Sequence, residues 1–138
     1  CDYMFKKNIH VKLGLENRAM YHEMPDEEEY RMIFDRLTDE PVYVWYDIGH
    51  GEMLNQLGVF DGFKVLRKYR NKLLGVHIHD VDDRFLDHLA PYSVSNKLDN
   101  YLDIIDLAPI KVFELSKNNT SDMIKTGVEQ LENKLDEL

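Results

Sequence analysis

Four short apolar segments recur along the chain, and each ends in a carboxylate or an imidazole. They are Leu-Gly-Leu-Glu at 13–16, Val-Tyr-Val-Trp-Tyr-Asp at 42–47, Leu-Leu-Gly-Val-His-Ile-His at 73–79 and Ile-Lys-Val-Phe-Glu at 110–114. Short segments of this composition, rich in β-branched and aromatic residues, are typical of strands. The stretches between them carry apolar residues at helical spacing. The sequence therefore predicts an α/β fold of four βα units, with parallel strands and right-handed crossovers.

Prolines, acidic residues and capping residues set the expected boundaries. Pro25 and the acidic run 26–29 begin a helix, because proline suits the first turn and acids suit the N-terminal dipole. Thr120, Ser121 or Asp122 caps the last helix. We expect strands at 9–15, 42–47, 73–79 and 110–115. The end of a helix is expected within 1–8, and helices are expected at 26–37, at 52–57, from residue 61 or 62, at 98–107 and after residue 120. A long polar loop is expected at 80–97.

The chain has the usual size of a single domain. It contains 138 residues, and no linker, low-complexity segment or charge block divides it. An open sheet of four parallel strands leaves two exposed edges, and the face shared by Tyr43, Trp45 and Asp47 needs a covering layer. Helices on both faces, as in flavodoxin-like folds, would supply that layer. A half-barrel completed by missing sequence or by a second chain is the other solution, and Trp45 is expected to fill a core in either.

Charge and cysteine content restrict the expected partners and location. The formal net charge of −9 argues against a surface that neutralises nucleic-acid phosphates. Cys1 is the only cysteine, so no internal disulfide framework exists, and a reducing compartment, the cytoplasm, is the expected location. No apolar run approaches the ~20 residues that span a bilayer, so no membrane partner is expected. Cys1 in place of Met is typical of a chain cut from something larger, or of processing.

The predicted strand ends collect residues that bind metals or transfer protons. Parallel strands present their carboxyl ends at one edge of the sheet, so we expect these side chains to lie close together. Mixed carboxylate and imidazole ligands without thiolates suit Zn, Mn, Co or Fe rather than a calcium cage or a cysteine-based zinc site. The candidates at the strand ends are Glu16, Asp47, His50, His77, His79, Asp80 and Glu114, and the long loop adds Asp87 and His88.

Five motifs in order resemble one known family. Gly-Leu-Glu-Asn-Arg at 14–18, Tyr-Asp-Ile-Gly-His at 46–50, Gly-Val-His-Ile-His-Asp at 75–80, Asp-His-Leu-Ala-Pro at 87–91 and Val-Phe-Glu-Leu at 112–115 resemble the C-terminal half of the xylose-isomerase-like TIM barrels. That superfamily includes sugar-phosphate isomerases and epimerases and the endonuclease IV group. The resemblance covers nearly all of 1–138, as a single segment, and implies strands five to eight of an eight-stranded barrel. The absent N-terminal half, or a homodimer partner, would then close the barrel.

The resemblance also implies a metal site. Glu16, Asp47, His77 and Glu114 match the four ligands of the divalent metal that the epimerases share, so a divalent cofactor (Mn, Zn, Co or Mg) is expected. Glu16 and Glu114 would also be the catalytic acid/base pair. His50 matches a position that binds substrate in the epimerases and a further zinc in the endonucleases.

A second set of matches lies in the long loop. His88 resembles the later zinc histidine of the endonucleases, and Asp87 or Asp80 is the candidate for its acidic companion. The chain departs from the family after Pro91, where Tyr-Ser-Val-Ser at 92–95 replaces the Gly-x-Gly turn of many relatives.

By this resemblance we expect a metal-dependent isomerase or epimerase acting on a sugar or sugar phosphate. In such enzymes the ion stabilises a developing enediolate while carboxylates move a proton at the adjacent carbon. An endonuclease IV-like phosphodiesterase acting on abasic DNA is the alternative, which the acidic loops disfavour because phosphate contacts dominate DNA affinity. A non-enzymatic half-barrel remnant, with ligands but without the substrate contacts of the missing half, is the third interpretation.

Each candidate also has a purely structural interpretation. Asp47 and His50 would form a hydrogen bond that steadies a turn. His77 and His79 share a strand face, so we favour His77 as the metal ligand and His79 as its support. Asp80 could equally cap the loop that follows it.

Overall fold

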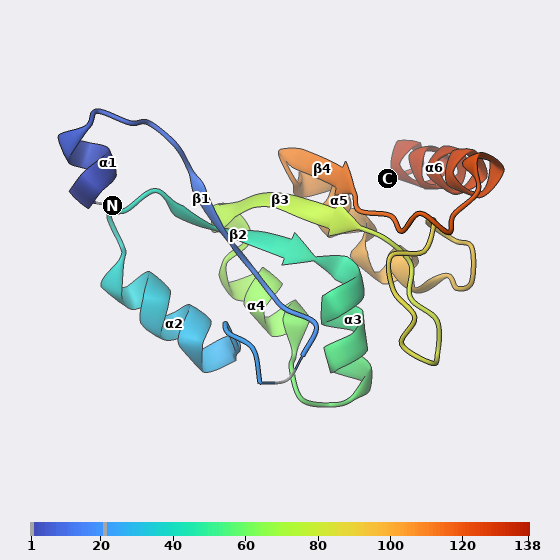
Figure 1. Ribbon diagram of the computed structural model, residues 1–138, viewed down its shortest axis with the longest axis horizontal. Coiled ribbons are helices and arrows are strands. Elements are labelled where there is room, and N and C mark those ends of the chain that lie inside the picture. The colour runs from blue at the N-terminus through green and yellow to red at the C-terminus, as the bar shows by residue number, and fades with distance from the viewer. Residues whose placement is uncertain (1, 21) are drawn as a thin grey trace.

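The computed structural model describes residues 2–20 and 22–138. Its centre is a sheet of four parallel strands in the order β1-β2-β3-β4, as Figure 1 shows. The strands are β1 (Leu13–Glu16), β2 (Val42–Asp47), β3 (Leu73–Ile78) and β4 (Ile110–Phe113). The expected α/β fold with an all-parallel sheet is therefore confirmed. Each strand lies beside the next one in the sequence, so the carboxyl ends of all four strands meet at one edge.

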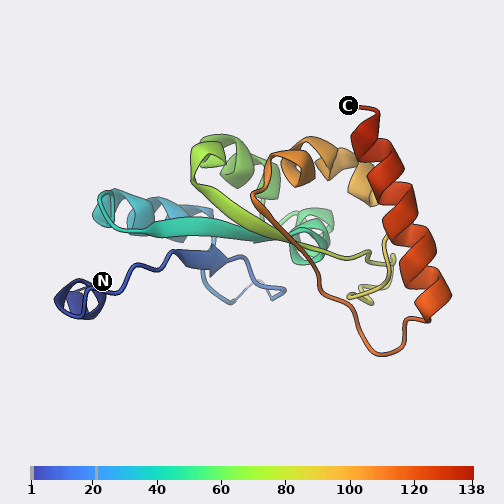
Figure 2. The same cartoon turned by 90° about the horizontal axis from the view of Figure 1, so that it is seen from above.

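Helices connect the strands and cover one face of the sheet. Along the chain they are α1 (Asp2–Lys6), α2 (Glu27–Arg36), α3 (Ile48–Gln56), α4 (Gly62–Lys68), α5 (Leu102–Leu107) and α6 (Ser121–Asp136), with 3-10 turns at Arg70–Lys72 and Lys97–Tyr101. In Figure 2, α2, α4 and α5 lie on the same side of the strands. α6 packs against α5 beyond the last strand. None of the described helices is long and apolar enough to cross a membrane.

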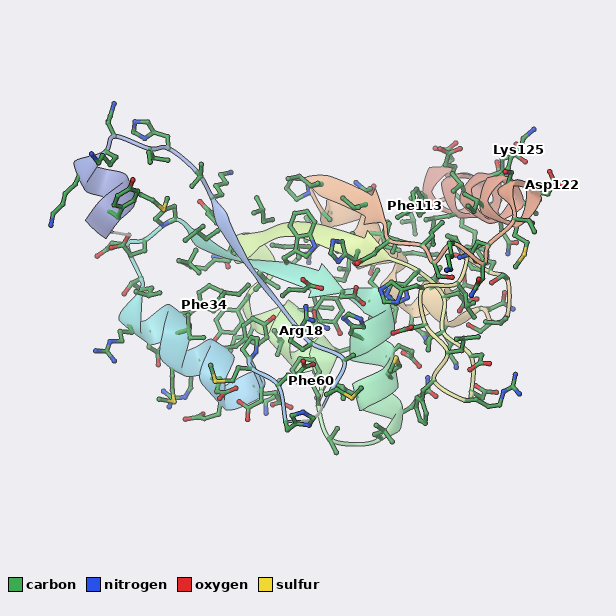
Figure 3. The ribbon with its side chains drawn as sticks, viewed as in Figure 1. Arg18, Phe34, Phe60, Phe113, Asp122 and Lys125 are labelled. Atoms are coloured by element: carbon green, nitrogen blue, oxygen red, sulfur yellow. The ribbon has the colours of Figure 1, made fainter. Side chains whose placement is uncertain are left out.

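The hydrophobic core lies between the sheet and these helices. Alternate strand residues, such as Val44 and Tyr46 of β2, point into it. Phe34 of α2 and Phe60, between α3 and α4, belong to the same layer (Figure 3). Tyr30 of α2 is completely buried in this core and anchors the first βα unit to it. This layer fixes the sheet and therefore the positions of the strand ends.

The opposite face of the sheet has no covering layer among the described residues (Figure 2). Trp45 is opposite Gly75, and Gly75 is opposite Ile110, so these residues share that face. Ile110 keeps 41% of its surface exposed and Val112 38%. The flavodoxin-like alternative, with helices on both faces, is therefore excluded for the described part of the chain. One-sided coverage fits a half-barrel-like arrangement instead.

Several boundaries differ from the predicted ones. The first strand spans only Leu13–Glu16, and the predicted helix at 98–107 begins as a 3-10 turn. The difference that bears on the strand ends is α3, which begins at Ile48 rather than at residue 52. Asp47 explains it, because its side chain accepts a hydrogen bond from the His50 N–H and caps the helix directly at the end of β2. The glycines at 49 and 51 concealed this helix in the sequence.

Candidate metal centre

Side chains from all four strand ends meet at the C-terminal edge of the sheet. Glu16 ends β1, Asp47 ends β2, His77 is the penultimate residue of β3, and Glu114 follows β4. Asp47 pairs with His77, and His77 pairs with Val112, two residues before Glu114, so these side chains point to the uncovered face. One ligand atom of each of the four candidates lies within 4.8 Å of the others. The four predicted residues thus converge.

His77 stands at the centre of this cluster. Its Nδ1 lies 2.7 Å from Glu114 Oε2, 3.4 Å from Asp47 Oδ2 and 3.4 Å from Glu16 Oε1. Yet His77 Nδ1, Asp47 Oδ2 and Glu114 Oε2 are buried and have no hydrogen-bond partner among the described residues. Leaving a buried polar atom unpaired costs about 1–3 kcal/mol. Three such atoms at one point, all of them metal-ligand atoms, fit a divalent cation.

The surroundings of Asp47 leave one of its oxygens free for the cluster. Oδ1 accepts hydrogen bonds from the His50 N–H at 2.7 Å and from His79 Nε2 at 2.9 Å. The backbone of Asp47 is held by the Asn17 amide, whose Nδ2 donates to the Asp47 carbonyl and whose Oδ1 accepts from the Asp47 N–H, both at 2.8 Å. Asp47 and Asn17 are completely buried. The carboxylate is therefore fixed with Oδ2 directed at His77.

His79 supports this carboxylate rather than joining the cluster. Its Nδ1 accepts the His88 N–H at 3.0 Å, so the ring proton lies on Nε2 and is donated to Asp47. The ring lies directly over Gly49, where a Cβ would come 2.0 Å from His79 Cε1. A glycine at 49 is thus a requirement of the His79 ring. This position agrees with the supporting role that the sequence interpretation assigned to His79.

A second group of donors lies beside the first. The rings of His50, His79 and His88 lie together, with ring centres 4.4–5.6 Å apart. Both nitrogens of His79 are engaged, which leaves His50 and His88 as the available imidazoles. Asp87 joins them, with Oδ1 3.0 Å from His88 Nδ1 and Oδ2 3.9 Å from His50 Nε2. His88 Nε2 is 3.7 Å from Glu114 Oε1, so the two groups adjoin.

The structure does not bring Asp80 into either group. Its carboxylate accepts the N–H groups of Val81, Val94 and Ser95 at 2.9–3.0 Å, and the Ser95 hydroxyl at 2.5 Å. Because these bonds use both oxygens, Asp80 organises the loop, as the alternative interpretation held. Tyr92, in the segment that departs from the Gly-x-Gly pattern, adopts a left-handed backbone with φ of +57°.

Asn17 and Asn119 are structural residues that sequence reasoning missed. Asn119 Oδ1 accepts the Ala90 N–H at 2.7 Å, and its Nδ2 donates to the His88 carbonyl at 2.8 Å. These bonds tie the long loop to the segment after β4 and hold His88, whose φ of +55° is sparsely populated outside glycine. The only signal in the sequence was an asparagine close after each of two strand ends, at Glu16 and Glu114.

Electrostatics favour a positive charge in the cluster. Burial alone raises the pKa of the Asp47 carboxyl, but the imidazoles of His77 and His79 outweigh it and hold that pKa below its ordinary value. The same contact with Asp47 raises the pKa of His77, against its own burial and with help from Glu114 and Glu16. The carboxylates therefore attract either a proton on His77 or a cation in its place.

Comparison of the chain with protein-family models, with curated proteins and with solved structures gave no match. Function is therefore inferred from the geometry of these two donor groups.

Proposed function

We propose that this chain forms the metal-binding half of a xylose-isomerase-like barrel and serves a divalent-metal-dependent sugar or sugar-phosphate isomerase or epimerase. The single observation that carries the proposal is the meeting of Asp47 Oδ2, His77 Nδ1 and Glu114 Oε2, three buried ligand atoms without hydrogen-bond partners. A mixed carboxylate and imidazole set of this kind fits Mn, Zn or Co. Glu16 is the fourth ligand.

The two glutamates are suited to move protons. A divalent ion in the cluster would polarise a carbonyl or hydroxyl of a bound sugar. Glu16 and Glu114 each direct one oxygen at His77, while Glu114 Oε1 and Glu16 Oε2 lie outside the cluster, toward His88 and Arg18 respectively. A carboxylate with one oxygen on the ion and one facing the open side can exchange a proton with the adjacent carbon. Both side chains are partly exposed, as this role requires.

The adjoining donors, His50, Asp87 and His88, would bind the substrate or a second metal. A second metal is the arrangement that favours the alternative function, an endonuclease IV-like phosphodiesterase on abasic DNA. The charge of the chain disfavours DNA as the substrate. Lys97 pairs with Asp83 at 2.8 Å, the other loop cation pairs with Asp82, and the chain carries a net charge of −9. Incision of an abasic-site duplex by the metal-loaded protein would favour the phosphodiesterase.

Metal binding is the first test of the proposed function. Titration calorimetry with Mn²⁺, Zn²⁺ and Co²⁺ should show one tight site, and Asp47→Asn should weaken it at least tenfold. Asparagine still caps α3 well, so the loss would report the missing anionic oxygen. Asp61→Asn is the matched control, because Asp61 caps α4 in the same way through the Lys64 N–H but lies outside the cluster. Absence of binding in the wild-type protein would leave only the non-enzymatic interpretation.

Proton exchange is the second test. The metal-loaded protein, incubated in D₂O with a panel of ketoses, aldoses and their phosphates, should introduce deuterium at the carbon next to the carbonyl. Glu114→Gln should abolish this exchange. A chain that binds metal but exchanges no proton, alone or with a complementary half-barrel, would overturn the isomerase assignment.

The uncovered face is part of the same proposal. β1 and β4 are both edge strands, and the side opposite the helices has no covering layer in the described residues. Four further parallel strands, from preceding sequence or from a second copy, would pair both edges and bury that face. Light scattering distinguishes the sources, because self-assembly gives twice the mass of a 16.4 kDa chain.

A further inference from the structure

Trp45 lies on the uncovered face across its two neighbouring strands. A Cβ at Gly14 of β1 would come 2.9 Å from Trp45 Cβ, and one at Gly75 of β3 would come 2.7 Å from Trp45 Cζ3. Both neighbouring strands therefore carry a glycine where the indole crosses them. The ring ends beside His77, with ring centres 5.2 Å apart and planes at 72°. Trp45 is the only tryptophan of the chain.

We propose that Trp45 is a positioning residue that holds the His77 imidazole with Nδ1 directed into the carboxylate cluster. This inference rests on the proposed metal centre and extends it from the ligands to the side chain that orients one of them.

The geometry of His77 shows why a positioning residue is needed. His79 and Asp47 are each fixed by hydrogen bonds. Neither ring nitrogen of His77 forms a hydrogen bond within the described part of the chain, and Nδ1 is buried without a partner. A histidine ring with no fixing hydrogen bond samples several rotamers. Perpendicular packing against a large aromatic ring removes those alternatives, because such pairs have a preferred geometry.

The two glycines make the contact specific. Gly75 lies two residues before His77 on the same strand face, so any side chain there would occupy the space that the indole fills. Its near neighbours are the Trp45 ring and the Ile110 carbonyl, 3.0 Å from the position of a Cβ. The indole thus lies against the backbone of Gly75 and contacts the His77 ring. A smaller side chain at 45 would leave the imidazole free to turn.

Three variants of the full chain test this role. Trp45→Leu should weaken Mn²⁺ or Co²⁺ binding about tenfold, whereas Trp45→Phe, which keeps an aromatic ring, should recover most of the affinity. Tyr43→Leu is the control, because Tyr43 lies on the same face two residues farther from the strand end. It should leave the affinity unchanged. Denaturation midpoints of the metal-free variants show whether each one is folded.

A double-mutant cycle separates positioning from general stability. If Trp45 acts through His77, Trp45→Leu should change metal affinity less than twofold in a His77→Gln background. An equal tenfold loss in both backgrounds would overturn the proposal. So would full affinity in Trp45→Leu.

A metal-free measurement keeps this inference distinct from the proposed function. In nitrogen-15 spectra of the imidazoles, His77 should show one dominant tautomer in the wild-type protein and averaged nitrogen shifts in Trp45→Leu. Wild-type protein that binds no metal but shows this difference would reject the metal site and retain the positioning role. Identical His77 spectra in both proteins would reject the positioning role, and Trp45→Phe decides the question if Trp45→Leu does not fold.

Discussion

Nδ1 of His77 lies 2.7 Å from Oε2 of Glu114, yet the two atoms make no hydrogen bond, and both are buried. An ion between them would pair both atoms at once. Saturating Mn²⁺ or Zn²⁺ should therefore stabilise the folded chain, by about 2.7 kcal/mol at a concentration 100 times the dissociation constant. Thermal unfolding with and without EDTA measures the effect. Glu114→Gln should lose most of the gain, and a melting temperature indifferent to metal in the wild-type protein would contradict the prediction.

The contact between Asp47 and His77 predicts opposite pH trends for the metal-free and metal-loaded protein. The pKa of His77 is raised above its ordinary 6.5, mainly by Asp47 and with help from Glu114 and Glu16. In the metal-free protein, this stabilisation is present below pH 6.5 and is lost as pH rises through the raised pKa of His77.

Metal binding reverses the trend. The ion needs a neutral His77, so affinity should fall about tenfold per pH unit once pH drops below the raised pKa. Urea denaturation of the EDTA-treated protein and calorimetric titration with Zn²⁺, each between pH 5.5 and 8.5, should give opposite slopes. Parallel slopes would mean that His77 does not compete with the ion.

Gly49 should be indispensable to the site for a reason that involves no ligand. Gly49→Ala places a methyl group against the His79 ring, where a Cβ would lie 2.0 Å from Cε1, so His79 must release Asp47. We expect the overpacking to lower the free energy of unfolding by about 1–3 kcal/mol. Metal affinity should fall at least tenfold.

Gly51→Ala is the matched comparison for this substitution. Gly51 lies in the same helix as Gly49, but a Cβ there would come 2.1 Å from the hydroxyl of Tyr46 in β2, which points into the core and away from the cluster. Urea denaturation should therefore show that both variants are destabilised, while calorimetry should show a loss of metal affinity only for Gly49→Ala. Equal affinity losses would indicate a general effect of loosening α3.

The sequence was sufficient to predict which side chains converge but not what supports them. The rule that parallel strands place their ends at one edge gave a larger set of candidates, and the family resemblance singled out Glu16, Asp47, His77 and Glu114, which do lie together. Asn17 escaped notice because its role depends on the distance between two strand ends across the sheet. A hydrogen bond between two residues 30 positions apart leaves no periodic pattern in the sequence from which it could be predicted.

Backbone geometry explains the other differences. α3 was placed four residues too late, because two glycines disfavour a helix unless a cap such as Asp47 and tertiary packing outweigh that preference. Asp80 was a candidate because it ends the motif that includes β3, but the loop that follows turns back and donates hydrogen bonds to both of its oxygens. For Asp47 and for Asp80, the sequence identified a polar side chain at a strand end, but tertiary contacts decided what that side chain does.

Buried tyrosines should set the alkaline limit of stability. Burial raises the pKa of Tyr30, Tyr46 and Tyr101 far above the ordinary 10, and neighbouring acidic groups such as Glu52 beside Tyr101 add to it. The raised pKa values lie in the folded state, so stability is unaffected below pH 10 and declines above it, as the unfolded chain ionises first. Above pH 10, each tyrosine should lower the free energy of unfolding by about 1.4 kcal/mol per pH unit.

Ultraviolet absorbance of tyrosinate and circular dichroism, followed together from pH 9 to 12, measure this effect. The three tyrosines should ionise only as the helical signal disappears. Tyr101→Phe should shift the unfolding midpoint to higher pH when it is compared with wild-type protein of equal stability near neutral pH. The substitution also leaves Glu52 without the 2.9 Å hydrogen bond from Tyr101. The surface residue Tyr3, which is 68% exposed, provides the control, since Tyr3→Phe should leave the midpoint unchanged. Ionisation of all tyrosines before any loss of helix would show that the core admits the phenolate.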